Sequence, residues 1–249
     1  MKTAIPVLTF HAIEERESVI SISPHVFRRG IARLQQHGYQ TLSLLKAADF
    51  IRSGQPFPER FFVITFDDGY QSVYENAFPV LQRHGMSATV FLAVGDRPGA
   101  NFSDRLPPLE NRNMLSWDEI REMQRYGIDF GAHTLTHPDL TCMAGPQLET
   151  EIYGSKVMIE DTLGTHITSF AYPYGRFNHR CRALVQKHFA CACSDRLGLV
   201  NVHSDLFALK RVDAYYLRTD RLFGIMLTGF FPWYLGVRNL PRRLKRTLS

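Results

Sequence analysis

Residues 61–64 form an apolar run, Phe-Phe-Val-Ile, that is followed almost at once by two adjacent carboxylates, Asp67 and Asp68. A short apolar run bounded by turn residues predicts a strand that is buried on both faces, as in a parallel sheet. Paired carboxylates at the end of such a strand are costly to desolvate unless a cation or hydrogen bonds offset their repulsion. Because neighbouring strand residues point in opposite directions, one could bind a metal while the other acts as a base. The simpler alternative is an ordinary Asp-Asp-Gly turn at Gly69.

Two histidines four residues apart, His133 and His137, offer the rest of a metal site. Residues 128–130 predict a short strand, and Pro138 pushes His137 away from helical dihedral angles. We therefore expect His133 at a strand end and His137 in the following loop. One Asp with two His would make a three-ligand set with room for water, as in catalytic metal sites. A capping histidine and a solvated histidine are the alternative reading of the pair.

Predicted strands and helices alternate along most of the chain. The predicted strands cover residues 5–10, 61–64, 88–92, 128–130, 167–171, 190–193 and 207–212. The predicted helices cover residues 24–36, 44–51, 72–84, 117–126, 146–163 and 179–188. This alternation predicts a parallel α/β architecture with its functional site at the carboxyl ends of the strands, where both motifs lie. Residues 95–113 contain three Pro and are predicted to form a long loop, either a lid or a substrate wall.

A third motif, residues 170–175 (Phe-Ala-Tyr-Pro-Tyr-Gly), also ends a predicted strand. Together with residues 65–69 (Thr-Phe-Asp-Asp-Gly) and 133–137 (His-Thr-Leu-Thr-His), it makes the chain resemble the polysaccharide deacetylase family, whose domain is also called the NodB homology domain. The resemblance implies a distorted, incomplete (β/α) barrel of about seven parallel strands. It also implies a metal-dependent amide hydrolase that removes N-acetyl groups from amino sugars.

The resemblance further implies a role for each site residue. Asp67 would be the catalytic base, and the backbone N–H of Tyr174 would help to form the oxyanion hole. The implied metal ligands are Asp68, His133 and His137. Zinc is the default metal, with nickel, cobalt and manganese as alternatives.

The general acid is expected at the N-terminus. Relatives commonly take it from a His in a Leu-x-x-His element near the C-terminus, but residues 206–216 contain no His and His203 lies in a predicted polar loop. Residues 8–11, Leu-Thr-Phe-His, instead place His11 at the end of the first predicted strand. We therefore expect a circularly permuted member, like the exopolysaccharide-modifying branch of the family, with His11 as the acid. A strand-end histidine that faces solvent is the alternative.

An arginine that many relatives carry two residues before the Pro of the third motif is replaced here by Ala171. In those relatives it pairs with the base. We expect Arg211, near the end of a late predicted strand, to take its place beside Asp67. The alternative is an arginine on a solvated face.

The C-terminal end differs in composition from the rest of the chain. Its last dozen residues hold five cations and no acid, which equals the whole formal net charge of +5. This indicates a basic tail rather than a basic domain, and we expect no nucleic-acid partner. Residues 222–237 are almost uncharged, aromatic and too short to span a bilayer. We expect a catalytic domain at residues 1–220, and a segment at 221–249 that either docks on a membrane surface or packs as the last barrel helix.

The N-terminus lacks the long apolar region and cleavage site of a signal peptide. This predicts a cytoplasmic protein, peripheral on the inner face of the membrane if residues 221–249 anchor it. The four Cys fit no zinc-knuckle spacing. Cys191 and Cys193 are expected to share one face of a strand as small buried side chains.

The predicted function is metal-dependent N-deacetylation of amino sugars in a polysaccharide or a lipid-linked glycan. A deformylase of a lipid-linked amino sugar would use the same site. A silent carbohydrate-binding module is a second alternative, although such a module has no need of these costly buried groups. An iron oxygenase with two His and one carboxylate is a third, but those enzymes usually have all-β scaffolds.

Overall fold

The computed structural model describes residues 4–95 and 105–247, with side chains up to residue 240. The loop predicted at residues 95–113 therefore falls partly outside the described residues.

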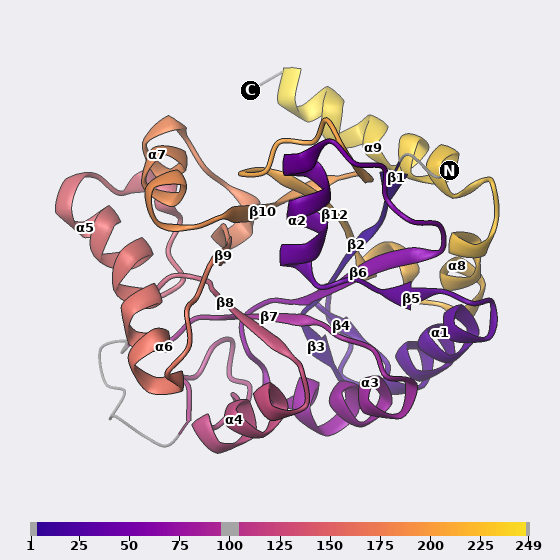
Figure 1. The fold of residues 1–249 in the computed structure, drawn as a ribbon, viewed down its shortest axis with the longest axis horizontal. Helices are drawn as coiled ribbons and strands as arrows, with labels where there is room; N and C mark the ends of the chain where they lie inside the picture. The colour runs from indigo at the N-terminus through magenta and orange to yellow at the C-terminus, as the bar shows by residue number, and fades with distance from the viewer. Residues whose placement is uncertain (1–3, 96–104, 248–249) are drawn as a thin grey trace.

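Seven parallel strands form a closed barrel at the centre of the described chain (Figure 1). Around the ring they are β2 (Val7–Phe10), β6 (Phe61–Phe66), β7 (Thr89–Leu92), β8 (Asp129–Ala132), β9 (Ser169–Ala171), β10 (Cys191–Leu197) and β12 (Leu209–Asp213). The N-terminal strand β2 closes the ring because it pairs with β12 on one side and with β6 on the other. The predicted barrel of parallel strands is confirmed, and it has one strand fewer than the eight of a (β/α)8 barrel.

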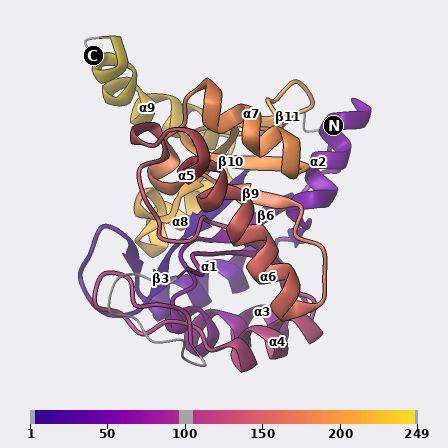
Figure 2. The ribbon, with the colours of Figure 1, turned by 90° about the vertical axis from the view of Figure 1, so that its left-hand side faces the viewer.

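Helices surround this barrel in both views (Figures 1 and 2). They are α1 (Pro24–Gln36), α2 (Leu44–Ser53), α3 (Phe78–His84), α4 (Trp117–Arg125), α5 (Gly145–Glu149), α6 (Ser155–Leu163), α7 (His179–His188), α8 (Asp220–Gly224) and α9 (Phe231–Thr247). Short strands add β5 (Gln40–Thr41) beside β6, the antiparallel pair β1 (Ala4–Ile5) with β11 (Val200–Asn201), and the parallel pair β3 (Ala12–Ile13) with β4 (Ser21–Ile22). Short helical turns are η2 (Leu140–Cys142), η4 (Pro173–Gly175), η5 (Ala214–Leu217) and η6 (Ile225–Leu227).

The helix starts follow from side-chain capping. Ser23, Ser43 and Asn178 each accept a hydrogen bond from a backbone N–H of the first turn of α1, α2 and α7. Ser116 and Glu119 form a capping box at the start of α4. These four helices begin where the sequence predicts, because a capping side chain satisfies backbone donors that the helix itself leaves free.

Two predicted helices contain a π-helical turn. Residues 72–84 divide into η1 (Val73–Ala77) and α3, and residues 146–163 divide into α5, η3 (Thr150–Gly154) and α6. A π turn is closed by hydrogen bonds between residues i and i+5. Glu151, in η3, is buried, with 7% of its surface exposed.

The barrel interior near the carboxyl ends of the strands is polar. The hydroxyls of Thr9 and Thr65 lie 3.1 Å apart, and Arg211 Nη1 lies 3.4 Å from Thr65 Oγ1. Cys191 and Cys193 are both buried in one apolar cluster on the same face of β10, as predicted.

The C-terminal segment packs partly against the core. Phe223, Met226, Phe231 and Leu235 are all buried there. In the described part of the chain, no helix combines the length and apolar character needed to cross a bilayer. The division at residue 220 stays a prediction.

Candidate active site

A cavity of about 470 Å³ opens at the carboxyl ends of the barrel strands. Its size is within the usual range for small-molecule sites. Every site residue predicted from the sequence lines this cavity. They are His11, Asp67, Asp68, His133, His137, Tyr174 and Arg211.

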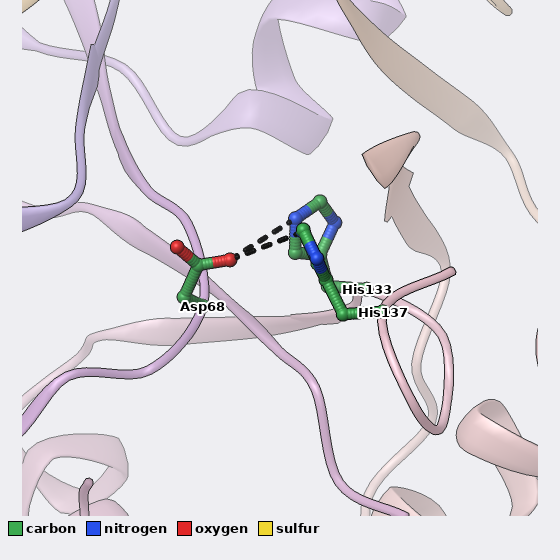
Figure 3. A group of neighbouring side chains, drawn as sticks. All are labelled: Asp68, His133 and His137. Carbon is green, nitrogen blue, oxygen red and sulfur yellow. Dashed lines mark ion pairs between the residues drawn. The ribbon is translucent and has the colours of Figure 1, made fainter. Parts of the chain in front are cut away.

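Asp68, His133 and His137 converge on one point (Figure 3). Asp68 Oδ1 lies 3.5 Å from His133 Nε2 and 3.4 Å from His137 Nε2. Asp68 follows β6. Asp68 and His137 both have left-handed backbone, with φ values of 74° and 57°. Left-handed backbone at a residue other than Gly is uncommon and is concentrated at functional sites, since the surrounding structure must hold it.

These three side chains fit a divalent metal. Ligands at zinc distances in a tetrahedron lie about 3.3 to 3.6 Å apart, which matches both separations. Asp68 Oδ1 is buried and has no hydrogen-bond partner, a costly arrangement unless a cation binds it. The Nδ1 of His133 lies 2.7 Å from the carbonyl oxygen of Ala171, so it is the donor and leaves Nε2 free to ligate. The remaining coordination position would be open to the cavity.

The electrostatics of Asp68 also suit a ligand. Burial opposes its ionisation, but the neighbouring His133 and His11 outweigh burial and hold its pKa well below the ordinary value. Asp68 is therefore a carboxylate at neutral pH, as metal binding requires.

Asp67 forms a buried two-pronged ion pair with Arg211. Arg211 Nη1 and Nη2 each lie 2.7 Å from a different oxygen of the Asp67 carboxylate. Arg211 Nε donates to the carbonyl oxygen of Ser194 at 3.0 Å, which fixes the guanidinium plane. Burial opposes ionisation of Asp67, but the charge of Arg211 and then that of His133 outweigh it, so its pKa is lowered. Arg211 thus stands beside Asp67 as expected, although residue 171 is Ala and carries no charge.

His11 stands at the end of β2, on the edge of the same cavity. Its Nε2 lies 3.9 Å from Asp67 Oδ2, beyond hydrogen-bond range, and its side chain is 21% exposed. The alternative of a histidine facing away from the site does not fit this position. The circular permutation itself stays a prediction.

Tyr174 lies in η4 with a φ of 56°, and its ring centre is 4.7 Å from that of His137. The next residue, Gly175, is pressed against β10. A Cβ there would lie 2.2 Å from Asp195 Cβ, so only Gly fits this turn. The close contact at Gly175 therefore holds the third motif in one backbone conformation at the cavity wall.

Several further residues line the cavity without having been predicted. They are Thr9, Glu110, Tyr172, Asp195, Asp213, Tyr215 and Tyr216. Asp213 could have been found, because it ends β12 at the same edge of the barrel as the motifs. Glu110 and Asp195 carry no comparable sequence signal.

The family model described as "Polysaccharide deacetylase" matches residues 54–189, which is more than half of the 249 residues. The chain belongs to the polysaccharide deacetylase family. This family comprises carbohydrate N-deacetylases, which are metal-dependent hydrolases, so the resemblance stated from the three motifs is confirmed.

Curated deacetylases are similar over differing shares of their length. YxkH of Bacillus subtilis, assigned by name to the polysaccharide deacetylases, is 28% identical over 209 residues, covering 84% of this chain and 70% of YxkH. The poly-beta-1,6-N-acetyl-D-glucosamine N-deacetylase of Escherichia coli K12 is 32% identical over 137 residues, 51% of this chain but only 20% of that enzyme. The enzyme of the same name from Staphylococcus epidermidis is 35% identical over 115 residues, 46% of this chain and 37% of that enzyme.

Solved deacetylase structures share the fold. BC0361, a polysaccharide deacetylase from Bacillus cereus, superimposes with a TM-score of 0.75 at 25% identity, covering 90% of this chain and 69% of that chain. The Streptococcus pyogenes deacetylase PplD, in complex with acetate, gives 0.74 at 23% identity, covering 84% and 92%.

Proposed function

We propose that this deacetylase hydrolyses the acetamide of N-acetylated amino sugars in a polysaccharide or a lipid-linked glycan, with zinc as its metal. The observation that carries the proposal is the convergence of Asp68, His133 and His137 beside the Asp67–Arg211 pair in one cavity. Relatives named for poly-beta-1,6-N-acetyl-D-glucosamine make that polymer the first substrate to test.

In this proposal Asp68, His133 and His137 hold the metal. When bound, the metal supplies Lewis-acid polarisation of the substrate carbonyl and activation of a water nucleophile. The lowered pKa of Asp67 keeps it ionised at neutral pH, ready to accept a proton from the attacking water. Arg211 holds both oxygens of that carboxylate, so the base is presented in one orientation.

The two other proposed groups act on the substrate amide. The backbone N–H of Tyr174 would donate to the oxygen that gains negative charge, which is the work of a fixed main-chain donor. His11 would deliver a proton to the leaving nitrogen, since an amine leaves far more readily than its anion. Both residues line the cavity, and that supports the assignment.

Acetate release from a panel of N-acetylated glycans tests the proposal. The protein is assayed metal-free and after restoration with zinc, nickel, cobalt or manganese. We expect acetate release that requires metal and is highest with zinc. Formate release from an N-formyl substrate, without acetate release, would instead support the deformylase. Glycan binding without release of either acid would support the silent binding module.

We also propose that the outer face of α9 docks on an anionic membrane surface. Phe231 and Leu235 of this helix are buried, whereas the opposite side presents Trp233, Val237 and Leu240 to solvent. Phe230, directly before the helix, is exposed as well, and the four apolar side chains are exposed to between 43% and 73%. The sequence beyond residue 240 adds four cations and no acid, a composition suited to anionic lipid headgroups. Such docking would favour a lipid-linked substrate.

Flotation with phosphatidylcholine vesicles, with and without phosphatidylglycerol, tests this docking. Point variants are preferable to removal of residues 221–249, because that segment contributes Phe223 and Phe231 to the core. We expect the Trp233→Ala, Phe230→Ala double variant to lose binding to anionic vesicles. Tyr126→Ala, which removes an exposed aromatic directly after the distant helix α4, is the matched control and should bind like wild type. The docking proposal is wrong if all three proteins float equally, or if none of them floats. Self-association of wild type through α9 would show that this face binds a second copy of the chain instead.

A further inference from the structure

The loop that carries the two histidines, residues 133–138, is held in an unfavourable backbone conformation. Thr134 and His137 have φ values of 71° and 57°, in the left-handed region that side chains other than Gly seldom adopt. Thr134 is fully buried, and its hydroxyl accepts a hydrogen bond from the His137 N–H at 3.0 Å. A single internal bond is a weak restraint for two such residues, so the conformation needs support from outside the loop.

Glu151 supplies that support. One oxygen of its carboxylate accepts hydrogen bonds from the N–H groups of Leu135 and Thr136, each at 2.9 Å. The other oxygen accepts from the Thr136 hydroxyl at 2.6 Å. All three donors lie between His133 and His137. A buried carboxylate with both oxygens engaged on one short segment holds that segment far more rigidly than a solvated side chain would.

The opposite side of the loop is fixed as well. The Gly95 N–H donates to the Leu135 carbonyl oxygen at 2.8 Å. The loop is therefore hydrogen-bonded on one side to the segment after β7 and on the other side to the helix that carries Glu151. The fit is close, because a Cβ on Gly95 would lie 2.5 Å from Leu135 Cβ. Leu135 also approaches Gly154, where a Cβ would lie 3.2 Å from Leu135 Cδ1. The histidine loop therefore has little freedom on this side once the Glu151 bonds are formed.

Helical spacing explains how an acid comes to face the loop. Residues 145–163 are continuous helix, which includes the π turn η3. Glu151 and Ser155 are buried together with Leu148, Ile152 and Ile159, and these positions recur at the three- and four-residue spacing of one helix face. The Glu151 carboxylate therefore lies on the buried face, in contact with the backbone between two proposed metal ligands.

We propose that Glu151 is a positioning residue for the metal site: through its three hydrogen bonds to residues 135 and 136, it sets the separation and orientation of the His133 and His137 imidazoles. The inference rests on the proposed metal set but not on the proposed substrate. Groups that orient metal ligands typically affect metal affinity about 10- to 100-fold. Glu151 touches neither substrate nor metal in this role.

Zinc affinity, measured by competition with a chelator on the purified full-length protein, tests the role. We expect Glu151→Ala to weaken zinc binding by about 10- to 100-fold. Glu151→Gln should lose less, because its amide oxygen can still accept from both backbone N–H groups. Glu149→Gln is the matched control, since it removes an equal charge from the same continuous helix, two residues away, where the side chain pairs with Lys187 and His188 of α7 and not with the histidine loop. It should bind zinc like wild type.

A second readout separates positioning from simple support of the fold. Zinc should raise the melting temperature of wild type and of Glu149→Gln by similar amounts, but raise that of Glu151→Ala much less, because the rise reports affinity. If Glu151 only stabilised the fold, Glu151→Ala would lower the metal-free and the zinc-loaded melting temperatures equally. That result, or unchanged zinc affinity, overturns the proposal.

The conservative variant decides the matter if Glu151→Ala does not fold. A loss of zinc affinity in Glu151→Gln, with an altered visible spectrum of the cobalt-loaded protein, then supports positioning, and wild-type values of both overturn it. The substrate proposal fails separately, because wild type would then bind zinc but release no acetate.

Discussion

Arg211 in β12 and Asp67, directly after β6, face each other although they are 144 residues apart in sequence. Their pairing satisfies two buried charges at once and fixes the orientation of the proposed base. A lysine at this position keeps the charge but cannot reproduce the two-pronged geometry. The carboxylate would then be free to rotate or to lean toward the His11 side of the cavity. Catalysis should depend on this geometry more than substrate binding does.

Arg211→Lys is therefore expected to lower kcat by about 10²-fold with little change in KM, since an orienting contact of this kind acts in the transition state. Arg211→Ala should lower kcat further and destabilise the protein by about 3–5 kcal/mol, because it leaves a buried carboxylate unpaired. Steady-state acetate release and urea unfolding measure the two effects. Wild-type activity in Arg211→Ala would remove Arg211 from the site.

His11→Gln should lower kcat on an amide by about 10²- to 10⁴-fold, as expected for loss of a general acid. The loss should be smaller on an acetyl ester, because an alcohol needs less help to leave than an amine. His203→Gln is the control, since His203 lies in an exposed loop and was the other candidate near the chain end. Equal losses on amide and ester would show that His11 does not protonate the leaving group.

Helices α1 and α8 meet at a contact that sets how the C-terminal segment packs. Gly30 of α1 faces the ring of Phe223 in α8, and a Cβ on Gly30 would lie 2.7 Å from three ring carbons. Phe223 is only 2% exposed, so other groups enclose its ring. The absence of a side chain at residue 30 thus allows close approach of the two helices.

Gly30→Ala is expected to lower the free energy of unfolding by about 1–3 kcal/mol, because overpacking outweighs the gain in helix propensity. Gly236→Ala is the matched control: it is also helical, but nothing lies within 4 Å of its added Cβ. It should be neutral or stabilising by up to about 1 kcal/mol. Urea unfolding monitored by circular dichroism compares them. A Gly30→Ala protein as stable as Gly236→Ala would contradict the close packing.

The whole molecule is built on a ring of strands that β2, the first barrel strand, closes. Because β2 lies between β6 and β12, residues from both ends of the chain share one cavity. The proposed metal ligands come from the β6 and β8 ends of this ring, so metal binding would tie separate parts of the barrel together. Stability of the entire domain should respond to the metal.

Zinc at about 100 times its dissociation constant should stabilise the protein by about 2.7 kcal/mol, since it binds the folded state and not the unfolded chain. Chelation should reverse the rise in melting temperature. His137→Ala should melt at the same temperature with and without zinc, because two of the three ligands remain and affinity falls. A zinc effect of equal size in His137→Ala would place the metal elsewhere.

The sequence by itself determined the class of fold, the helix caps and the proposed ligands. These follow from local chemistry: apolar runs that must be buried, side chains that cap backbone donors, and carboxylate and imidazole groups at strand ends. The tertiary structure decided between the two readings of Arg211, which pairs with Asp67, and it supplied the contacts of Glu151 with the histidine loop and the packing of α9. Such contacts depend on the order of the strands and on how the helices pack around them, which no short stretch of sequence encodes.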